Sequence, residues 1–135
     1  MFPQKTTQVA KQIVLEVVVG STYTKTDLFQ VLTGVEAVVF VADSQWVRED
    51  ANYYWLELLQ EGLEKHGIKF EEIPFVLQLN KRDLPEIMPV ELMREKLESK
   101  GRPVIETIAK LGEGVLETFG TITTQVMGKN TGARK

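Results

Sequence analysis

Three mainly apolar runs constrain the fold of this 135-residue chain more than any other feature. They are Ile13–Val19, Ala37–Ala42 and Pro74–Leu79, and each stops at a glycine or a polar residue. Runs of this length and composition form strands that are buried on both faces, as in parallel sheets covered by helices. Pro103–Thr107 is a shorter run of the same kind. The sequence therefore predicts a three-layer α/β domain with four strands in a mainly parallel sheet flanked by helices.

Amphipathic stretches alternate with these runs. Apolar residues recur with helical spacing between Asp43-Ser44 and Gly67, so we predict a long helix there, capped by Asp43 or Ser44. Its residues Tyr54 and Trp55 are expected in the core. Three further helical segments are predicted: a short helix or turn within 22–34, a helix opened by Pro89, and a last helix after Gly112-Glu-Gly114.

Composition excludes several classes of protein. The net charge of −3 and the absence of a basic stripe argue against nucleic-acid binding. The chain has no cysteine and one histidine, so neither a disulfide nor a metal site is expected. No apolar run reaches the ~20 residues of a membrane span, and the N-terminus lacks the apolar core of a signal peptide. We therefore predict a cytoplasmic protein without a membrane span.

The tetrapeptide Asn80-Lys81-Arg82-Asp83 follows the third apolar run directly. Its side chains suit a guanine ring. The Asp83 carboxylate can accept from the ring N1–H and the exocyclic amine together, a pair that adenine does not offer. The Asn80 amide can bond N7 and brace a neighbouring loop, and the Lys81 stem can lie flat over the base. The alternative interpretation is an exposed charged turn after a strand.

Together with Glu106-Thr-Ile-Ala-Lys110-Leu-Gly-Glu-Gly114, this tetrapeptide resembles the C-terminal half of a Ras-like small GTPase. The closer resemblance is to the bacterial gliding-motility MglA-type branch, through Gly34 to Ser44, Pro74 to Pro85 and Met88 to Glu91. The order and spacing of the two motifs make this resemblance specific. It implies a truncated small-GTPase-like domain over 12–127, and the polar ends of the chain predict a flexible lead-in over 1–11 and a disordered tail over 128–135.

The resemblance implies a role for each matching residue. Asp83 would fix the guanine, with Asn80 and Lys81 in support. The backbone N–H of Ala109 would meet the ring oxygen, and Lys110 would stack across the base from Lys81. Ile108 stands where the family usually has a serine, so the hydroxyl of that serine is lost.

The front half of the family pattern is missing. No glycine precedes Gly20, so the phosphate loop Gly-x4-Gly-Lys-Ser/Thr has no counterpart, and the first switch with its magnesium-binding threonine is absent too. Lys5-Thr6-Thr7 resembles the end of that loop only by chance, because none of the residues before it is a glycine. Gly20 and Ser21 would be a remnant of the second switch, with Ser21 where the family has a water-orienting glutamine. We therefore expect a truncated P-loop NTPase fold that lacks its first strand, with no catalytic residue.

Several functions follow from the resemblance. The first is a degenerate MglA-like GTPase that binds GTP or GDP weakly, at about millimolar or weaker affinity, without magnesium and without hydrolysis on its own. The second is a non-catalytic interaction module, a pseudo-GTPase of a polarity or motility system, with a Roadblock-type regulatory protein as partner. A third is a GTPase completed in trans by a phosphate-loop fragment. Self-association is also expected, because the missing strand would leave sheet edges unpaired.

Overall fold

The computed structural model describes residues 23–98 and 100–132, with side chains up to Gly128. The predicted lead-in over residues 1–11, the predicted strand Ile13–Val19 and the remnant Gly20-Ser21 lie outside the described residues.

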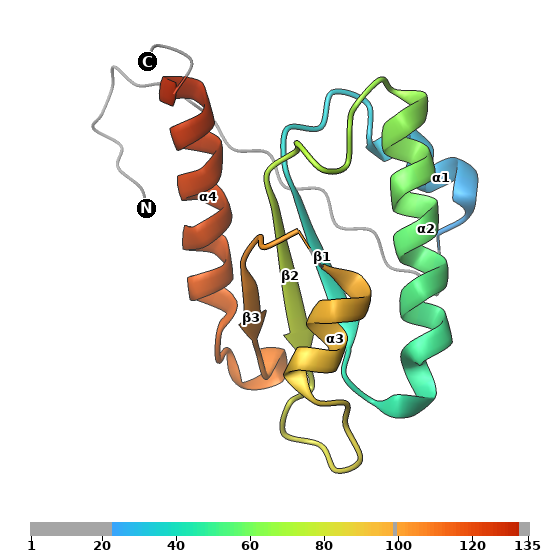
Figure 1. Cartoon of the computed structure of the whole chain (residues 1–135), viewed down its shortest axis with the longest axis vertical. Coiled ribbons are helices and arrows are strands. Elements are labelled where there is room, and N and C mark those ends of the chain that lie inside the picture. Colours follow the sequence, from blue (N-terminus) through green and yellow to red (C-terminus); the bar gives the residue numbers. More distant parts are fainter. Residues whose placement is uncertain (1–22, 99, 133–135) are drawn as a thin grey trace.

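Within this part of the chain, one sheet holds three parallel strands in the order β1-β2-β3. β1 spans Val38–Asp43, β2 spans Phe75–Asn80 and β3 spans Val104–Glu106. Val38 is in register with Phe75, and Leu77 with Val104. All three carboxyl ends therefore meet at one edge, at the bottom of Figure 1. The predicted α/β class, with a parallel sheet, is confirmed.

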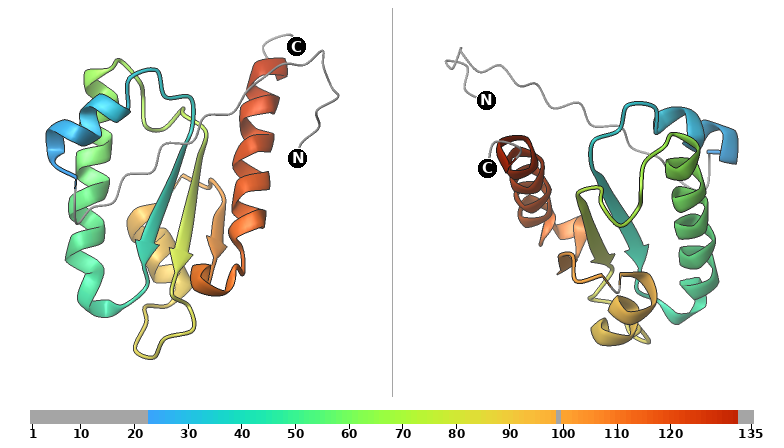
Figure 2. Two further views of the ribbon diagram at one scale, coloured as in Figure 1. Left: turned by 180° about the vertical axis from the view of Figure 1, so that it is seen from behind. Right: turned by 45° about the horizontal axis from the view of Figure 1, so that its top comes forward.

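Helices lie on both sides of this sheet. α2 (Glu49–Lys65) and α1 (Lys25–Val31) are on one side, and α4 (Val115–Gly132) is on the other (Figures 1 and 2). The short α3 (Val90–Leu97) lies near the carboxyl ends of the strands. Residues 128–132, which the sequence placed in a polar tail, continue α4 as helix.

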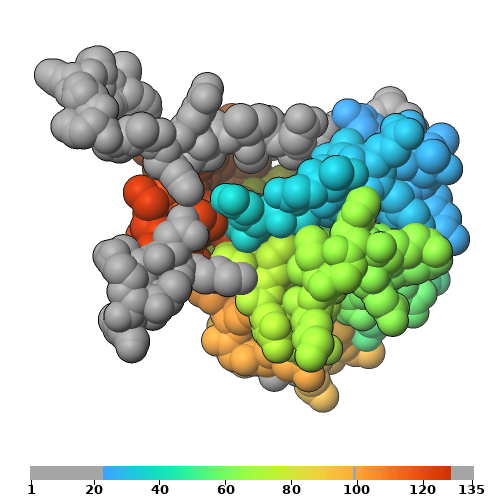
Figure 3. All heavy atoms as spheres, turned by 90° about the horizontal axis from the view of Figure 1, so that it is seen from above, coloured from blue at the N-terminus to red at the C-terminus, as the bar shows by residue number. Residues whose placement is uncertain are grey.

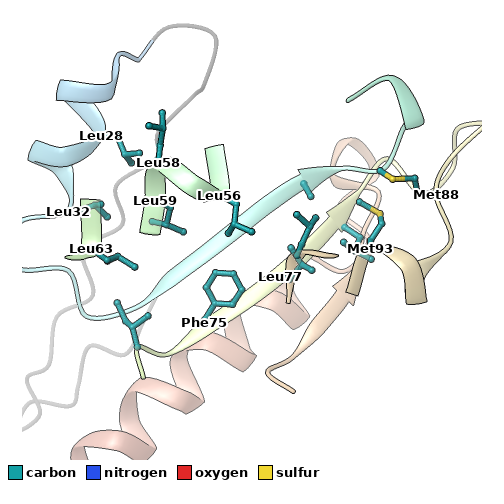
Figure 4. Packing of buried hydrophobic residues seen from close by; sticks show 14 residues of the cluster. Leu28, Leu32, Leu56, Leu58, Leu59, Leu63, Phe75, Leu77, Met88 and Met93 are labelled. Carbon is teal, nitrogen blue, oxygen red and sulfur yellow. The ribbon is translucent and has the colours of Figure 1, made fainter. Parts of the chain in front are cut away.

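The core fills the space between the sheet and the side that carries α1 and α2 (Figure 4). Alternation along β2 explains this, because Phe75, Leu77 and Leu79 point to that face and are fully buried. Met88 and Met93 close the same cluster near α3. Val76 and Gln78 alternate with these residues, so they belong to the face toward α4.

Two predictions about α2 are wrong. A 3-10 turn, η2 (Trp46–Arg48), precedes the helix, and the N-cap is Arg48, whose side chain makes no capping hydrogen bond. Tyr54 is 56% exposed rather than buried. The inward stripe of α2 instead runs through Leu56, Leu59 and Leu63, and Tyr54 is two positions from Leu56, on the opposite side of the helix.

The amino ends of the strands are closed by loops and by one side chain of α4. The segments before β1 and before β2 lie side by side at this end (Figure 3), where Val38 N–H donates to Pro74 O at 3.0 Å. β3 begins only opposite Leu77, so Phe75 has no strand partner on that side. Gln125 of α4 replaces it, since its amide accepts from Phe75 N at 3.1 Å and donates to Phe75 O at 3.2 Å.

Candidate functional site

The predicted site residues converge at the carboxyl edge of β2 and β3. Residues 80–83 form the first loop and residues 106–114 form the second loop. The side chain of Asn80 joins them, because its Oδ1 accepts from Ala109 N at 2.9 Å and from Thr107 Oγ1 at 3.1 Å. Thr107 is 1% exposed, so this contact lies in the interior. These two hydrogen bonds join the loops in the way that the predicted bracing role of Asn80 requires.

Arg82 adds a second tie between the same loops. Its backbone N–H donates to Thr107 O at 3.2 Å, and its Nε lies 3.1 Å from Glu106 Oε1. Its guanidinium also donates to Met88 O at 2.7 Å, on the segment that leads to α3. No sequence pattern marked Arg82, since it occupies the variable position of the tetrapeptide. Thr107 stood out only as a polar residue at a strand end.

The second loop is held in shape by its own backbone and by a glycine. Ile108 and Glu113 form an isolated antiparallel bridge with N–H···O distances of 3.1 and 3.2 Å, around the 3-10 turn η3 (Ala109–Leu111). Gly114 has a φ of 82°, and a Cβ there would stand 2.5 Å from Glu106 O. Only glycine fits that position without displacing the strand end.

Both lysines of the site contact carboxylates. Lys81 adopts a left-handed backbone with φ of 67°, and its Nζ lies 3.1 Å from Asp43 Oδ2 at the end of β1. Lys110 Nζ lies 3.6 Å from Asp83 Oδ2, whose side chain is 28% exposed. The structure thus brings Asn80, Lys81, Asp83, Ala109 and Lys110 to one edge of the sheet.

Two of the groups expected to contact a base already have partners here. The Ala109 N–H donates to Asn80, so a ring oxygen would have to share or replace that bond. Asp83 would likewise exchange the Lys110 ammonium for the N–H groups of a base. Among the described residues, no hydrogen bond occupies Asn80 Nδ2, which leaves that donor for a ligand acceptor.

Asp43, at the end of β1, is a charged residue of this edge that lies outside both sequence motifs. Burial raises its pKa, but hydrogen bonds from Gln45 and the Lys81 ammonium outweigh burial and hold the pKa below its ordinary value. Asp43 is therefore a stable carboxylate at neutral pH. The sequence had marked it only as a polar strand end and a possible helix cap.

A comparison with curated proteins gives a clear relative. The mutual gliding-motility protein MglA of Myxococcus xanthus (strain DK1622) is 42% identical to this chain over 97 residues. This stretch is related to MglA-type small GTPases. It covers 72% of the chain and spans about half, 50%, of the length of that relative. No family model matches the chain.

The relationship agrees with the fold. Three parallel strands in one sheet between helices form an α/β arrangement compatible with part of a Ras-like fold. In residues 23–98 and 100–128, no three acidic or histidine side chains gather as a metal site. No helix in the described part of the chain is both long and apolar enough to cross a membrane.

Proposed function

We propose that this chain recognises the guanine base of a guanine nucleotide with its first and second loops. The observation that carries the proposal is the junction of these loops by Asn80, which places Asp83 and Ala109 on the same edge. Ligands of parallel α/β sheets bind at this edge. The relationship to an MglA-type GTPase supports the same ligand.

The chemistry of the edge selects guanine over adenine. Asp83 accepts from N1–H and from the exocyclic amine, after its carboxylate leaves Lys110. Asn80 Nδ2 donates to N7 while Oδ1 keeps its contact with Thr107. Ala109 N–H turns to the ring oxygen, and the stems of Lys81 and Lys110 cover the two faces of the ring. Adenine has no N1–H and presents its amine elsewhere, so the carboxylate contact fails.

Base contacts alone give weak binding. Four contacts at about 1 kcal/mol each offset an association cost of at least ~4 kcal/mol. We therefore propose millimolar or weaker affinity for GDP, that is, a binding free energy no more negative than about −4 kcal/mol. GTP hydrolysis requires groups that position the phosphates, the magnesium ion and the attacking water. The residues of this edge are proposed to contact the base, so we propose that they do not hydrolyse GTP by themselves.

The test compares Asp83→Ala with Glu113→Ala by NMR titration of the ¹⁵N-labelled chain with GMP and AMP. Glu113 is an exposed acid of the second loop, so its loss controls for net charge. We expect GMP to shift the amides of both loops in wild type and Glu113→Ala, and to shift none in Asp83→Ala. Equal shifts with AMP, or retained GMP shifts in Asp83→Ala, would exclude this function.

A second function, a protein-interaction module, is favoured by one observation. Apolar side chains within and just after the second loop face solvent: Leu111 is 65% exposed, Leu116 82% and Phe119 46%. Contiguous apolar surface marks protein contacts, and Leu116 and Phe119 are three positions apart on α4, so they share one side of that helix. Under this proposal the chain is a cytoplasmic pseudo-GTPase of a polarity or motility system that binds a Roadblock-type regulator or a second copy of itself. Leu116→Ser would then abolish association while Asp83→Ala left it intact.

A further inference from the structure

Asp43 is fixed more firmly than a surface carboxylate. Its backbone N–H donates to Asn52 Oδ1 at 3.1 Å, and its backbone O accepts from Asn52 Nδ2 at 2.9 Å. Asn52 is itself buried in α2, with 7% exposure. The carboxylate accepts from Gln45 N at 3.0 Å and from Gln45 Nε2 at 3.1 Å. Both the main chain and the side chain of Asp43 therefore have one preferred position.

Lys81 reaches this carboxylate from the first loop. Its left-handed backbone, with φ of 67°, turns the side chain away from the direction that β2 would give it, and Nζ stops 3.1 Å from Asp43 Oδ2. The side chain of Asp43 is 20% exposed and that of Lys81 47%. Arg48 is a second cation nearby, but its Nε is 4.0 Å from the same oxygen. Lys81 is thus the close partner.

We propose that Asp43 is a positioning residue of the base site, which holds the ammonium of Lys81 so that the stem of Lys81 is ordered before a base arrives. This inference rests on the proposed function. A free lysine side chain loses rotamer freedom when it packs against a ring. Anchoring its charged end in advance removes part of that loss, which is how preorganisation raises affinity.

The size of the effect follows from the exposure of the pair. Ion pairs that remain partly in water correspond to about a two- to fivefold change in an equilibrium constant. Asp43→Asn keeps the shape and the acceptor for Gln45 and removes the charge. We expect this variant to weaken GMP binding by about two- to fivefold, with the same pattern of shifted amides.

A double-mutant cycle separates positioning from a general loss of structure. Lys81→Met keeps an apolar stem without the ammonium, so Asp43→Asn should have no further effect on the GMP dissociation constant in that background. Arg48→Gln is the matched control and should leave the constant unchanged. An unchanged constant in Asp43→Asn, or an equal loss in both backgrounds, would overturn the proposal.

A second measurement does not depend on nucleotide. ¹³C relaxation of the lysine ε-methylenes should show Lys81 more ordered than the exposed Lys69 in the wild-type chain. In Asp43→Asn we expect Lys81 to fall to the level of Lys69. If Lys81 is as mobile as Lys69 in wild type, positioning by Asp43 is refuted. If Lys81 is ordered by Asp43 and GMP still fails to bind, the proposed function is refuted and the anchoring contact stands.

Discussion

The role of Asn80 as the junction of the two loops gives the sharpest test of the structure. Asn80→Ala removes the acceptor of two hydrogen bonds, from Ala109 N at 2.9 Å and from Thr107 Oγ1 at 3.1 Å. Asn80→Asp keeps an oxygen at the same place, so it preserves both bonds. The same substitution replaces the Nδ2 donor by a second acceptor, which cannot bond N7 of a base.

The expected magnitude follows from where the two donors lie. A hydrogen bond contributes about 0.5–1.5 kcal/mol net, and a buried donor left unpaired costs about 1–3 kcal/mol. Ala109 is exposed, so its N–H regains water and costs little. Thr107 is buried, but its hydroxyl keeps a weaker contact at 3.4 Å with Leu79 O. We therefore expect Asn80→Ala to lower the free energy of unfolding by about 1–2 kcal/mol, and Asn80→Asp to change it by less than about half of that.

Urea unfolding followed by tryptophan fluorescence measures these differences, and GMP titration measures binding in the same variants. The structure predicts loss of stability and binding in Asn80→Ala, and loss of binding alone in Asn80→Asp. If Asn80→Ala unfolds at the wild-type urea concentration, or if the two variants lose equal stability, the junction is not formed as described.

Three further predictions concern stability. Gly114→Ala should destabilise the chain by about 1–3 kcal/mol in urea unfolding, because its Cβ would stand 2.5 Å from Glu106 O. Gly120→Ala, whose Cβ would meet no atom within 4 Å, should be neutral or stabilising, and equal effects of the two substitutions would contradict this. Gln125→Ala should lower the free energy of unfolding by about 1–3 kcal/mol, because it leaves the backbone N–H and C=O of Phe75 unpaired. Hydrogen exchange at the Phe75 amide should then become faster, and an unchanged exchange rate would refute the prediction. Asp43 has a lowered folded-state pKa, so its stabilisation is present above the unfolded pKa and is lost below about pH 4; the stability difference between wild type and Asp43→Asn should shrink over that range, and a constant difference would argue against it.

The described strands and the start of the first loop were predictable because local sequence determines them. The apolar run Pro74–Leu79 and the abrupt change to Asn80 predict a buried strand with a polar carboxyl end, and β2 has those limits within one residue. The pairing of this loop with residues 106–110 followed from the resemblance to a small GTPase, which the order and spacing of the two motifs make specific. Both signals lie in contiguous residues.

The ion pair of Asp43 with Lys81 could not be predicted in the same way. Its partners are far apart in the chain, and they meet only because β1 and β2 are adjacent and Lys81 takes a left-handed backbone. The prediction that Asp43 or Ser44 caps α2 was wrong for a related reason. The Asp43 carboxylate accepts from Gln45 N within a turn, and the helix begins later, after η2. The contact of Ala109 N–H with Asn80 likewise depends on the closed shape of the second loop.

The central claim, that this edge reads guanine through Asp83, is tested most directly by comparing GMP, IMP and AMP in one NMR titration series. IMP keeps N1–H and lacks the exocyclic amine, so it should bind about fivefold more weakly than GMP, which corresponds to one hydrogen bond of ~1 kcal/mol. AMP should give no saturable shifts in residues 80–83 and 106–110. Indistinguishable titrations with GMP and AMP would contradict the account.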